Sequence, residues 1–412
     1  MQRQTVLLNN EALSRIIAER EVKQWLLARR MGIDRKTISR WLSGRTQRIS
    51  KENLTKLCDI LEIGESAICV MDRLEALGTR EDRWEAARKL SDEDLVEIVG
   101  PSNNWELAES LVKSTIDPDM PAGLLSKLYH MLARVYHYMR RAEDFKRCSE
   151  IAIRYAQQAS DEYMELQGRL CLSTSLLMVA DLKQAAANYE QCLLTPELFT
   201  AKALAASLSN LSSAYHQLGE FRKSLDYSSQ ALKAWSKVGS NMSHATAWYL
   251  RAQIHIELSM ASEARSSIDE CIRIAEEVRY QRIVNLMQLM RADLLSLEGR
   301  HDDAVDAVER GLALLPDTPR VSYITLETAA RPMRRAGLLD RAEECLNIEV
   351  DAEQQFGFEL ASGTMERARL QLARGDEEGA IELAARANQY FRDIGADLRC
   401  VDGLPTEHYR RL

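Results

Sequence analysis

The stretch LSNLSSAYHQLGEFRKSLDYSSQAL, residues 208–232, contains two helical patterns on either side of a glycine. In the first pattern, the small residue Ser212 comes three positions before the larger Tyr215. In the second, Ser224 and Ala231 are the small residues. Small side chains at fixed positions let two helices approach closely, and Gly219 suits the turn between them. We therefore predict a helical hairpin here.

The same pattern recurs along the chain. Residues 249–272 and 289–312 align with it, and the position of Ser224 has equivalents at 145, 185, 264, 304, 342 and 380. Self-similarity at a fixed period indicates stacked hairpins. The hairpins resemble tetratricopeptide repeats, whose usual length is about 34 residues, whereas the spacing here is 38–40 residues. The resemblance implies a right-handed superhelix of about seven hairpins over residues 124–412.

Positive charge is concentrated at the N-terminal end. Residues 1–62 contain 13 Lys and Arg against 7 Asp and Glu, whereas the whole chain has a net charge of −8. Such asymmetry indicates a small polyanion-binding head on an acidic body. The segment between them, residues 65–123, contains helical patterns, and the sequence leaves open whether it is a linker or a degenerate repeat.

The head contains short helical patterns separated by glycines. We predict a helix over 10–20 capped by Asn10, a helix over 23–31 ended by Gly32, and a helix from Arg35 capped by Asp34. Two short helices joined by a tight turn form a helix-turn-helix motif, whose second helix enters the major groove of DNA. Ile38, Trp41 and Leu42 are spaced to pack inward, which leaves basic residues on the outer face.

Residues 11–63 resemble the Cro/repressor-type DNA-binding domain, through Gln24, Ala28, the GI of residues 32–33, the TISR of residues 37–40 and the basic segment after Gly44. The resemblance implies a five-helix domain over residues 1–64. It also implies phosphate contact by Gln24, base reading by the start and middle of the third helix, and backbone contact by the following loop. The candidate DNA-binding residues are Gln24, Arg35, Lys36, Ser39, Arg40, Ser43, Arg45 and Arg48.

The whole architecture resembles the RRNPP group of peptide-responsive transcription regulators. That resemblance implies an all-α chain, a homodimer, and a groove that binds a short peptide or protein tail. Repeat geometry places candidate groove residues on the first helices of the hairpins, with three arginines suited to an acidic group. The candidates are His216, Tyr249, Gln253, Asp293, Arg331, Arg334 and Arg369. The competing interpretation is that these arginines pair with nearby Glu on a solvated face.

Other classes of function lack support in the sequence. No catalytic motif spacing is present, so we predict neither an enzyme nor a cofactor or metal site. The scattered cysteines and the absence of a long apolar run or signal peptide indicate a cytoplasmic protein without a membrane partner. Two hypotheses stay open: a ligand-responsive transcription regulator, or an antitoxin-like or phage-defence scaffold whose repeats bind a partner protein on DNA.

Overall fold

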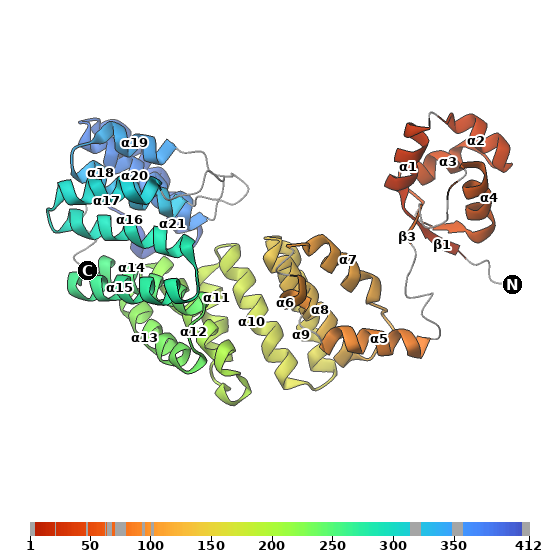
Figure 1. The fold of residues 1–412 in the computed structure, drawn as a ribbon, viewed down its shortest axis with the longest axis horizontal. Helices are drawn as coiled ribbons and strands as arrows, with labels where there is room; N and C mark the ends of the chain where they lie inside the picture. Colours follow the sequence, from red (N-terminus) through yellow and green to blue (C-terminus); the bar gives the residue numbers. More distant parts are fainter. Residues whose placement is uncertain are drawn as a thin grey trace. The chain divides into compact units, whose positions relative to one another are not determined.

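The computed structural model describes residues 5–20, 22–46, 48–61, 63, 68–70, 80–92, 95–99, 103–313, 323–347 and 357–405. These residues are mostly helical, as the sequence predicts (Figure 1). By its internal packing the chain divides into two compact units, residues 1–124 and 125–412. The finer division into three parts at residues 64 and 123 stays a prediction. None of the described helices combines the length and apolarity needed to cross a bilayer.

The head combines four helices with a small sheet. Its elements are β1 (Thr5–Leu8), α1 (Asn10–Glu19), α2 (Gln24–Met31), α3 (Arg35–Leu42), β2 (Arg48–Ser50), α4 (Lys51–Leu61) and β3 (Cys69–Val70). The strands are antiparallel in the order β2-β1-β3, with Val6 opposite Ile49 and Leu8 opposite Cys69. The sequence predicted five helices and no strand in the head. The described residues contain four helices, and the segments on either side of the motif form the sheet.

The head core explains why these elements form. Leu13, Leu27, Ile38 and Leu57 come from the four helices, are almost completely buried and pack in one cluster with Ile49 of β2. One local prediction was wrong: Asn9, rather than Asn10, caps α1 by accepting from the Ala12 amide at 3.0 Å. Asn10 instead donates to the Trp41 and Thr46 carbonyl oxygens. This side chain therefore ties α1 to the end of α3.

Helices α5 (Arg80–Asp92), α6 (Leu95–Val99) and α7 (Trp105–Thr115) follow the head. The repeats come next as successive antiparallel helix pairs, visible in Figure 1. Their helices are α8 (Ala122–Tyr138), α9 (Ala142–Gln158), α10 (Glu162–Met178), α11 (Leu182–Cys192), α12 (Ala201–Leu218), α13 (Phe221–Val238), α14 (Met242–Glu257), α15 (Ala261–Glu277), α16 (Gln281–Leu297), α17 (His301–Ala313), α18 (Tyr323–Arg335), α19 (Leu339–Asn347), α20 (Gly357–Ala373) and α21 (Glu377–Asp393). Short 3₁₀ turns, η4 (Pro196–Leu198) and η6 (Asp397–Arg399), lie between α11 and α12 and after α21.

The predicted repeat positions form the contacts between paired helices. The seven residues at the Ser224-equivalent positions are all at most 2% exposed: Phe145, Ala185, Ser224, Ala264, Ala304, Ala342 and Ala380. In the third pair, Ser224 and Ser212 exchange hydrogen bonds across the helices, each hydroxyl donating to the other residue's carbonyl at 2.7–2.8 Å. Small residues therefore let the backbones approach, and the first helices of the pairs remain available to line an inner surface.

Candidate functional site

The helix-turn-helix motif is built by α2, a tight turn and α3. Gly32 ends α2 in the left-handed conformation with φ of 70°, which glycine adopts without a steric penalty. Asp34 then caps α3 by accepting from the Lys36 amide at 2.9 Å. Ile38 and Trp41 are buried against the rest of the head. The opposite face of α3 is consequently fixed in the outward direction.

The outward face of α3 and the turn after it present the predicted DNA-binding residues. Gln24 is half-buried at the first position of α2, and the remaining candidates are exposed: Arg35, Lys36, Ser39, Arg40, Ser43, Arg45 and Arg48. Ser43 is the C-cap of α3. Arg48 was expected in a loop, but it begins β2, where it lies opposite Leu7 and donates to the Thr5 hydroxyl at 3.4 Å. These exposed cations suit phosphate oxygens and guanine edges.

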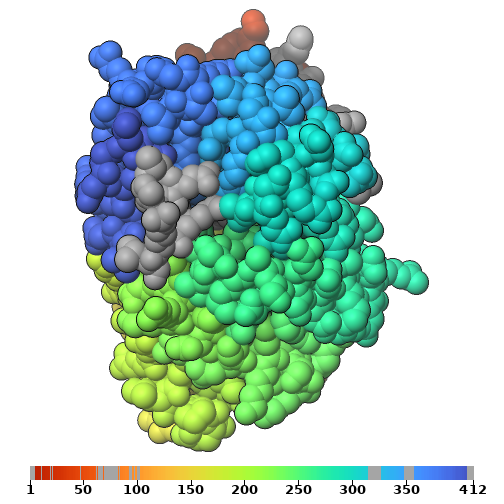
Figure 2. Space-filling model, turned by 90° about the vertical axis from the view of Figure 1, so that its left-hand side faces the viewer, coloured from red at the N-terminus to blue at the C-terminus, as the bar shows by residue number. Residues whose placement is uncertain are grey.

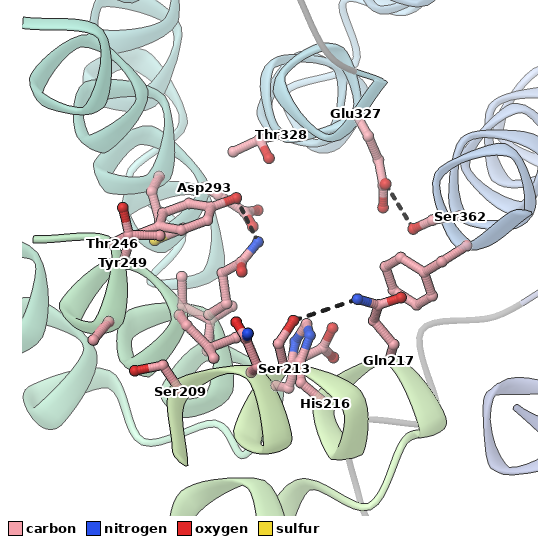
Figure 3. A pocket seen from close by; sticks show the side chains of 18 of the residues that line it. Ser209, Ser213, His216, Gln217, Thr246, Tyr249, Asp293, Glu327, Thr328 and Ser362 are labelled. Carbon is pink, nitrogen blue, oxygen red and sulfur yellow. Dashed lines mark hydrogen bonds between the residues drawn. The ribbon is translucent and has the colours of Figure 1, made fainter. Parts of the chain in front are cut away.

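The repeat body contains a cleft of about 350 Å³. Figure 3 shows side chains from the first helices of successive pairs converging on it: α12, α14, α16, α18 and α20. Hydroxyl and amide side chains dominate its polar lining, namely Ser209, Asn210, Ser213, Gln217, Ser243, Thr246, Tyr249, Gln253, Thr328 and Ser362. Its apolar wall includes Trp235, Leu250, Ile256, Met290 and Phe358. The cleft therefore offers donors, acceptors and apolar contacts together.

Several polar side chains of the cleft are hydrogen-bonded to one another. Gln217 donates to Ser213 at 3.3 Å and Gln253 donates to Tyr249 at 2.8 Å. Between the neighbouring helices α18 and α20, the Ser362 hydroxyl donates to Glu327 at 2.6 Å (Figure 3). Because these bonds join neighbouring side chains on the cleft surface, a ligand can replace them with bonds of its own.

The predicted arginine cluster binds carboxylates of its own chain. Arg331 lines the cleft and contacts Asp293 at 3.3 Å as well as Glu327. Arg334 and Arg369 instead bind Glu366, at 2.7 and 2.9 Å, and are not among the residues that line the cleft. The competing interpretation from the sequence, pairing with nearby acids, describes these contacts. The face is not solvated, however, because Asp293, Glu327 and Glu366 are at most 3% exposed.

At one end of the cleft, Arg399 bridges the C-terminal turns of α12 and α14, and we call this end the closed end. His216, Glu257 and Arg399 line it, and Arg399 contacts Glu257 at 2.9 Å and donates to the His216 carbonyl at 2.6 Å. Burial opposes ionisation of Glu257, but Arg399 lowers the pKa of this carboxyl to about 2. Burial and the nearby Arg399 lower the pKa of His216 to about 3. At neutral pH, the closed end therefore holds an ion pair and a neutral imidazole.

Acid is expected to destabilise the repeat body through His216. In the unfolded chain the pKa of His216 is about 6.5, so above this pH the imidazole is neutral in both the folded and the unfolded state. Between about 6.5 and 3 the unfolded state binds a proton that the folded state rejects, so stability falls as the pH falls. From pH 7 to pH 5, this side chain alone should cost about 2 kcal/mol. Urea unfolding of His216→Gln should lack that part of the pH dependence, whereas His301→Gln, at an exposed position, should keep it. An unchanged dependence in His216→Gln would contradict the assignment.

The structure brings most of the predicted groove residues together. His216, Tyr249, Gln253, Asp293 and Arg331 all line the cleft. Sequence reasoning missed Arg399, Phe358 and Glu257. The repeat pattern gives no sign of Arg399, because this residue follows the last hairpin. Phe358 and Glu257 lie on first helices, but at positions that the repeat geometry did not select as groove candidates.

Comparison with known families identifies both parts of the chain. Residues 12–71 match the Cro/C1-type HTH DNA-binding domain, and residues 203–277 match the tetratricopeptide repeat. The chain thus contains a Cro/C1-type helix-turn-helix domain and tetratricopeptide repeats, as the sequence predicts. No curated protein matches the chain.

The solved structures that resemble this chain have low sequence identity to it. A Rap protein complexed with competence and sporulation factor is 14% identical, with a TM-score of 0.52, and the match covers 76% of this chain and 90% of that one. A tetratricopeptide repeat protein from Parabacteroides merdae is 17% identical, with a TM-score of 0.46 and coverage of 66% and 98%. Bacillus thuringiensis PlcR, solved with the peptide PapR7 and DNA, is 14% identical, with a TM-score of 0.39 and coverage of 65% and 94%. The first of these likenesses supports the fold of the repeat body.

Proposed function

We propose that this protein is a transcription regulator that binds specific duplex DNA through α3 and a short peptide or protein tail through its repeat cleft. The observation that carries the proposal is the presence of both surfaces in one chain. The exposed face of α3 presents Arg35, Lys36 and Arg40, and the first helices of the repeats enclose a polar cleft. The head supplies the affinity for DNA, and the cleft supplies the regulatory input.

The lining of the cleft favours a short peptide over a purely apolar ligand. Gln217 and Gln253 carry amides that can both donate to and accept from a peptide backbone, and Trp235 and Phe358 provide apolar contacts beside them. A volume of about 350 Å³ is at the lower end of the range for small-ligand sites, which suits a few residues at a time. We assign ligand contact to His216, Tyr249, Gln253, Asp293 and Arg331. Arg334 and Arg369 do not line the cleft, and we assign them to the buried ion-pair network around Glu366 that supports it.

The proposal includes a homodimer. One head provides a small surface, whereas tight specific binding usually uses two half-sites about one helical turn of DNA, or a multiple of it, apart. A ligand that prefers one arrangement of the heads then changes DNA affinity by its differential affinity for the two arrangements. The alternative function is an antitoxin-like or phage-defence scaffold. The same cleft would then bind a segment of a folded partner protein.

Native mass spectrometry of the full chain, purified from its own host, tests this proposal. We expect a homodimer carrying a peptide, and we expect the peptide to be absent when the cleft residues Tyr249 and Gln253 are both changed to alanine. Gln230 and Lys233 are exposed on α13 and lie outside the cleft lining, so their replacement by alanine is the control. A folded protein copurifying in place of a peptide would favour the scaffold, and a monomer would contradict the dimer.

A further inference from the structure

The segment after the last repeat, residues 394–399, contacts hairpins that are far away in the sequence. Asp397 pairs with Lys183 of α11 at 3.0 Å, and Ile394 packs with Leu182 in one apolar cluster. In Figure 2 the dark blue C-terminal part of the chain borders on the yellow-green part that contains these earlier repeats. The segment therefore joins the last hairpin to the second and third, and we call residues 394–399 the C-terminal clasp.

Arg399, the last residue of the clasp, makes most of its buried contacts with other helices. Besides its contacts with Glu257 and the His216 carbonyl, its guanidinium lies 4.5 Å from the ring centre of Phe221 and 5.2 Å from that of Phe358. Phe221 begins α13 and Phe358 belongs to the first turn of α20. One buried cation thus connects α12, α13, α14 and α20 through hydrogen bonds and cation–π contacts.

The backbone of the third hairpin is shaped for the clasp. Gly219, between α12 and α13, has φ of 83°, and a Cβ added there would lie 3.0 Å from the Leu398 Cβ. A larger residue would be strained in this conformation and would also crowd Leu398. The close approach of the clasp to the α12–α13 turn is therefore built into both segments.

Apart from Arg399 and the half-buried Ile394, the clasp meets the earlier hairpins through solvent-exposed side chains. The Lys183 and Asp397 side chains are each about two-thirds exposed, and Leu398 is 66% exposed. Exposed ion pairs add little stability, in contrast to the apolar clusters that join the helices within and between neighbouring hairpins. The geometry indicates a contact that can open while the hairpins on both sides stay folded.

We propose that the C-terminal clasp is a reversible latch that closes the repeat array on itself and forms the closed end of the cleft. With the latch closed, Arg399 contacts His216 and Glu257, and Phe358 lies beside His216. A ligand in the cleft therefore contacts both the earlier helices α12 and α14 and the C-terminal elements that the latch brings to them. Such a ligand binds the closed form more tightly and shifts the array toward it. The latch itself does not depend on the proposed function, and its test needs no ligand.

Hydrogen–deuterium exchange of the full chain tests the latch. Arg399→Ala should open it. Amide exchange should accelerate by about tenfold or more in the clasp, in the α12–α13 turn at residues 216–221 and in the last turn of α14 at residues 254–258. Exchange in the head and in α8–α9 should be unchanged. Arg386→Ala is the matched control, because Arg386 is exposed on α21 and contacts the half-buried Tyr390 of its own helix, with its guanidinium 5.7 Å from the ring centre.

The other outcomes of the exchange experiment overturn the proposal. Acceleration confined to residues 394–401 would mean that the segment is a tail lying on a closed array. Acceleration spread evenly over all repeats would mean that Arg399 is a part of the general core. If Arg399→Ala does not fold, the pair Glu257→Gln with Arg399→Met removes both buried charges together and is judged by the same three patterns.

Discussion

Replacing Glu366 with alanine is expected to reduce the stability of the repeat body by about 3–5 kcal/mol. Glu366 is fully buried in α20 and binds Arg334 of α18 and Arg369 of its own helix. Burial alone would raise the pKa of Glu366, but the nearby arginines lower it below its usual value. The carboxylate is therefore charged at neutral pH. Its removal leaves two guanidinium groups in low-dielectric surroundings with less compensating charge.

Urea unfolding followed by circular dichroism measures this loss. Glu382→Ala is the matched control, because Glu382 lies on the exposed face of the neighbouring α21, and exposed substitutions usually change stability by less than about 0.5 kcal/mol. Glu366→Gln keeps the shape and removes the charge, so it separates charge from packing. If Glu366→Ala unfolds within about 1 kcal/mol of the unmodified chain, the arginine network is more hydrated than its burial indicates.

The repeat architecture could be predicted because it depends on local rules. Small residues must occur where paired helices approach, and Ala185, Ala264 and Ala304 are buried at those positions. In the head, Gly32 and Asp34 mark the end of one helix and the start of the next through their own backbone and side-chain chemistry. Such signals lie within one or two turns of the structure that they specify, so a single sequence contains them.

The cleft could be predicted only in part, because many of its contacts join residues that are distant in the sequence. Arg369 pairs with Glu366 at the local i,i+3 spacing, but Arg331 pairs with Asp293 across 38 residues and Arg334 pairs with Glu366 across 32. Arg399 reaches His216 across 183 residues. The small sheet of the head has the same origin, because β1 pairs with two segments more than 40 residues later. Such pairings follow from the tertiary fold, and the periodicity of the sequence does not predict them.

Removing either Arg35 or Arg40 is expected to abolish preference at one base pair of the operator, at a cost of about 1–3 kcal/mol, or up to about a hundredfold in Kd. Both side chains are exposed on α3, whose buried face is fixed by Ile38 and Trp41. An arginine held in this way can donate two hydrogen bonds to guanine. Arg45 lies in the turn after α3, so Arg45→Ala should weaken all sequences alike and reduce the salt dependence of binding.

Selection of duplexes from a randomised library by the full chain, followed by affinity measurements at fixed salt, distinguishes these effects. Arg35→Ala and Arg40→Ala should each broaden the selected sequence at a different position. Arg45→Ala should select the same sequence with lower affinity. Lys56→Ala is the control for loss of a positive charge, because Lys56 lies on α4 in an exposed pair with Glu52. Variants of Arg35 and Arg40 that select the unmodified sequence with unmodified affinity would show that α3 does not read the bases. DNA recognition would then have to be assigned to another surface of the head.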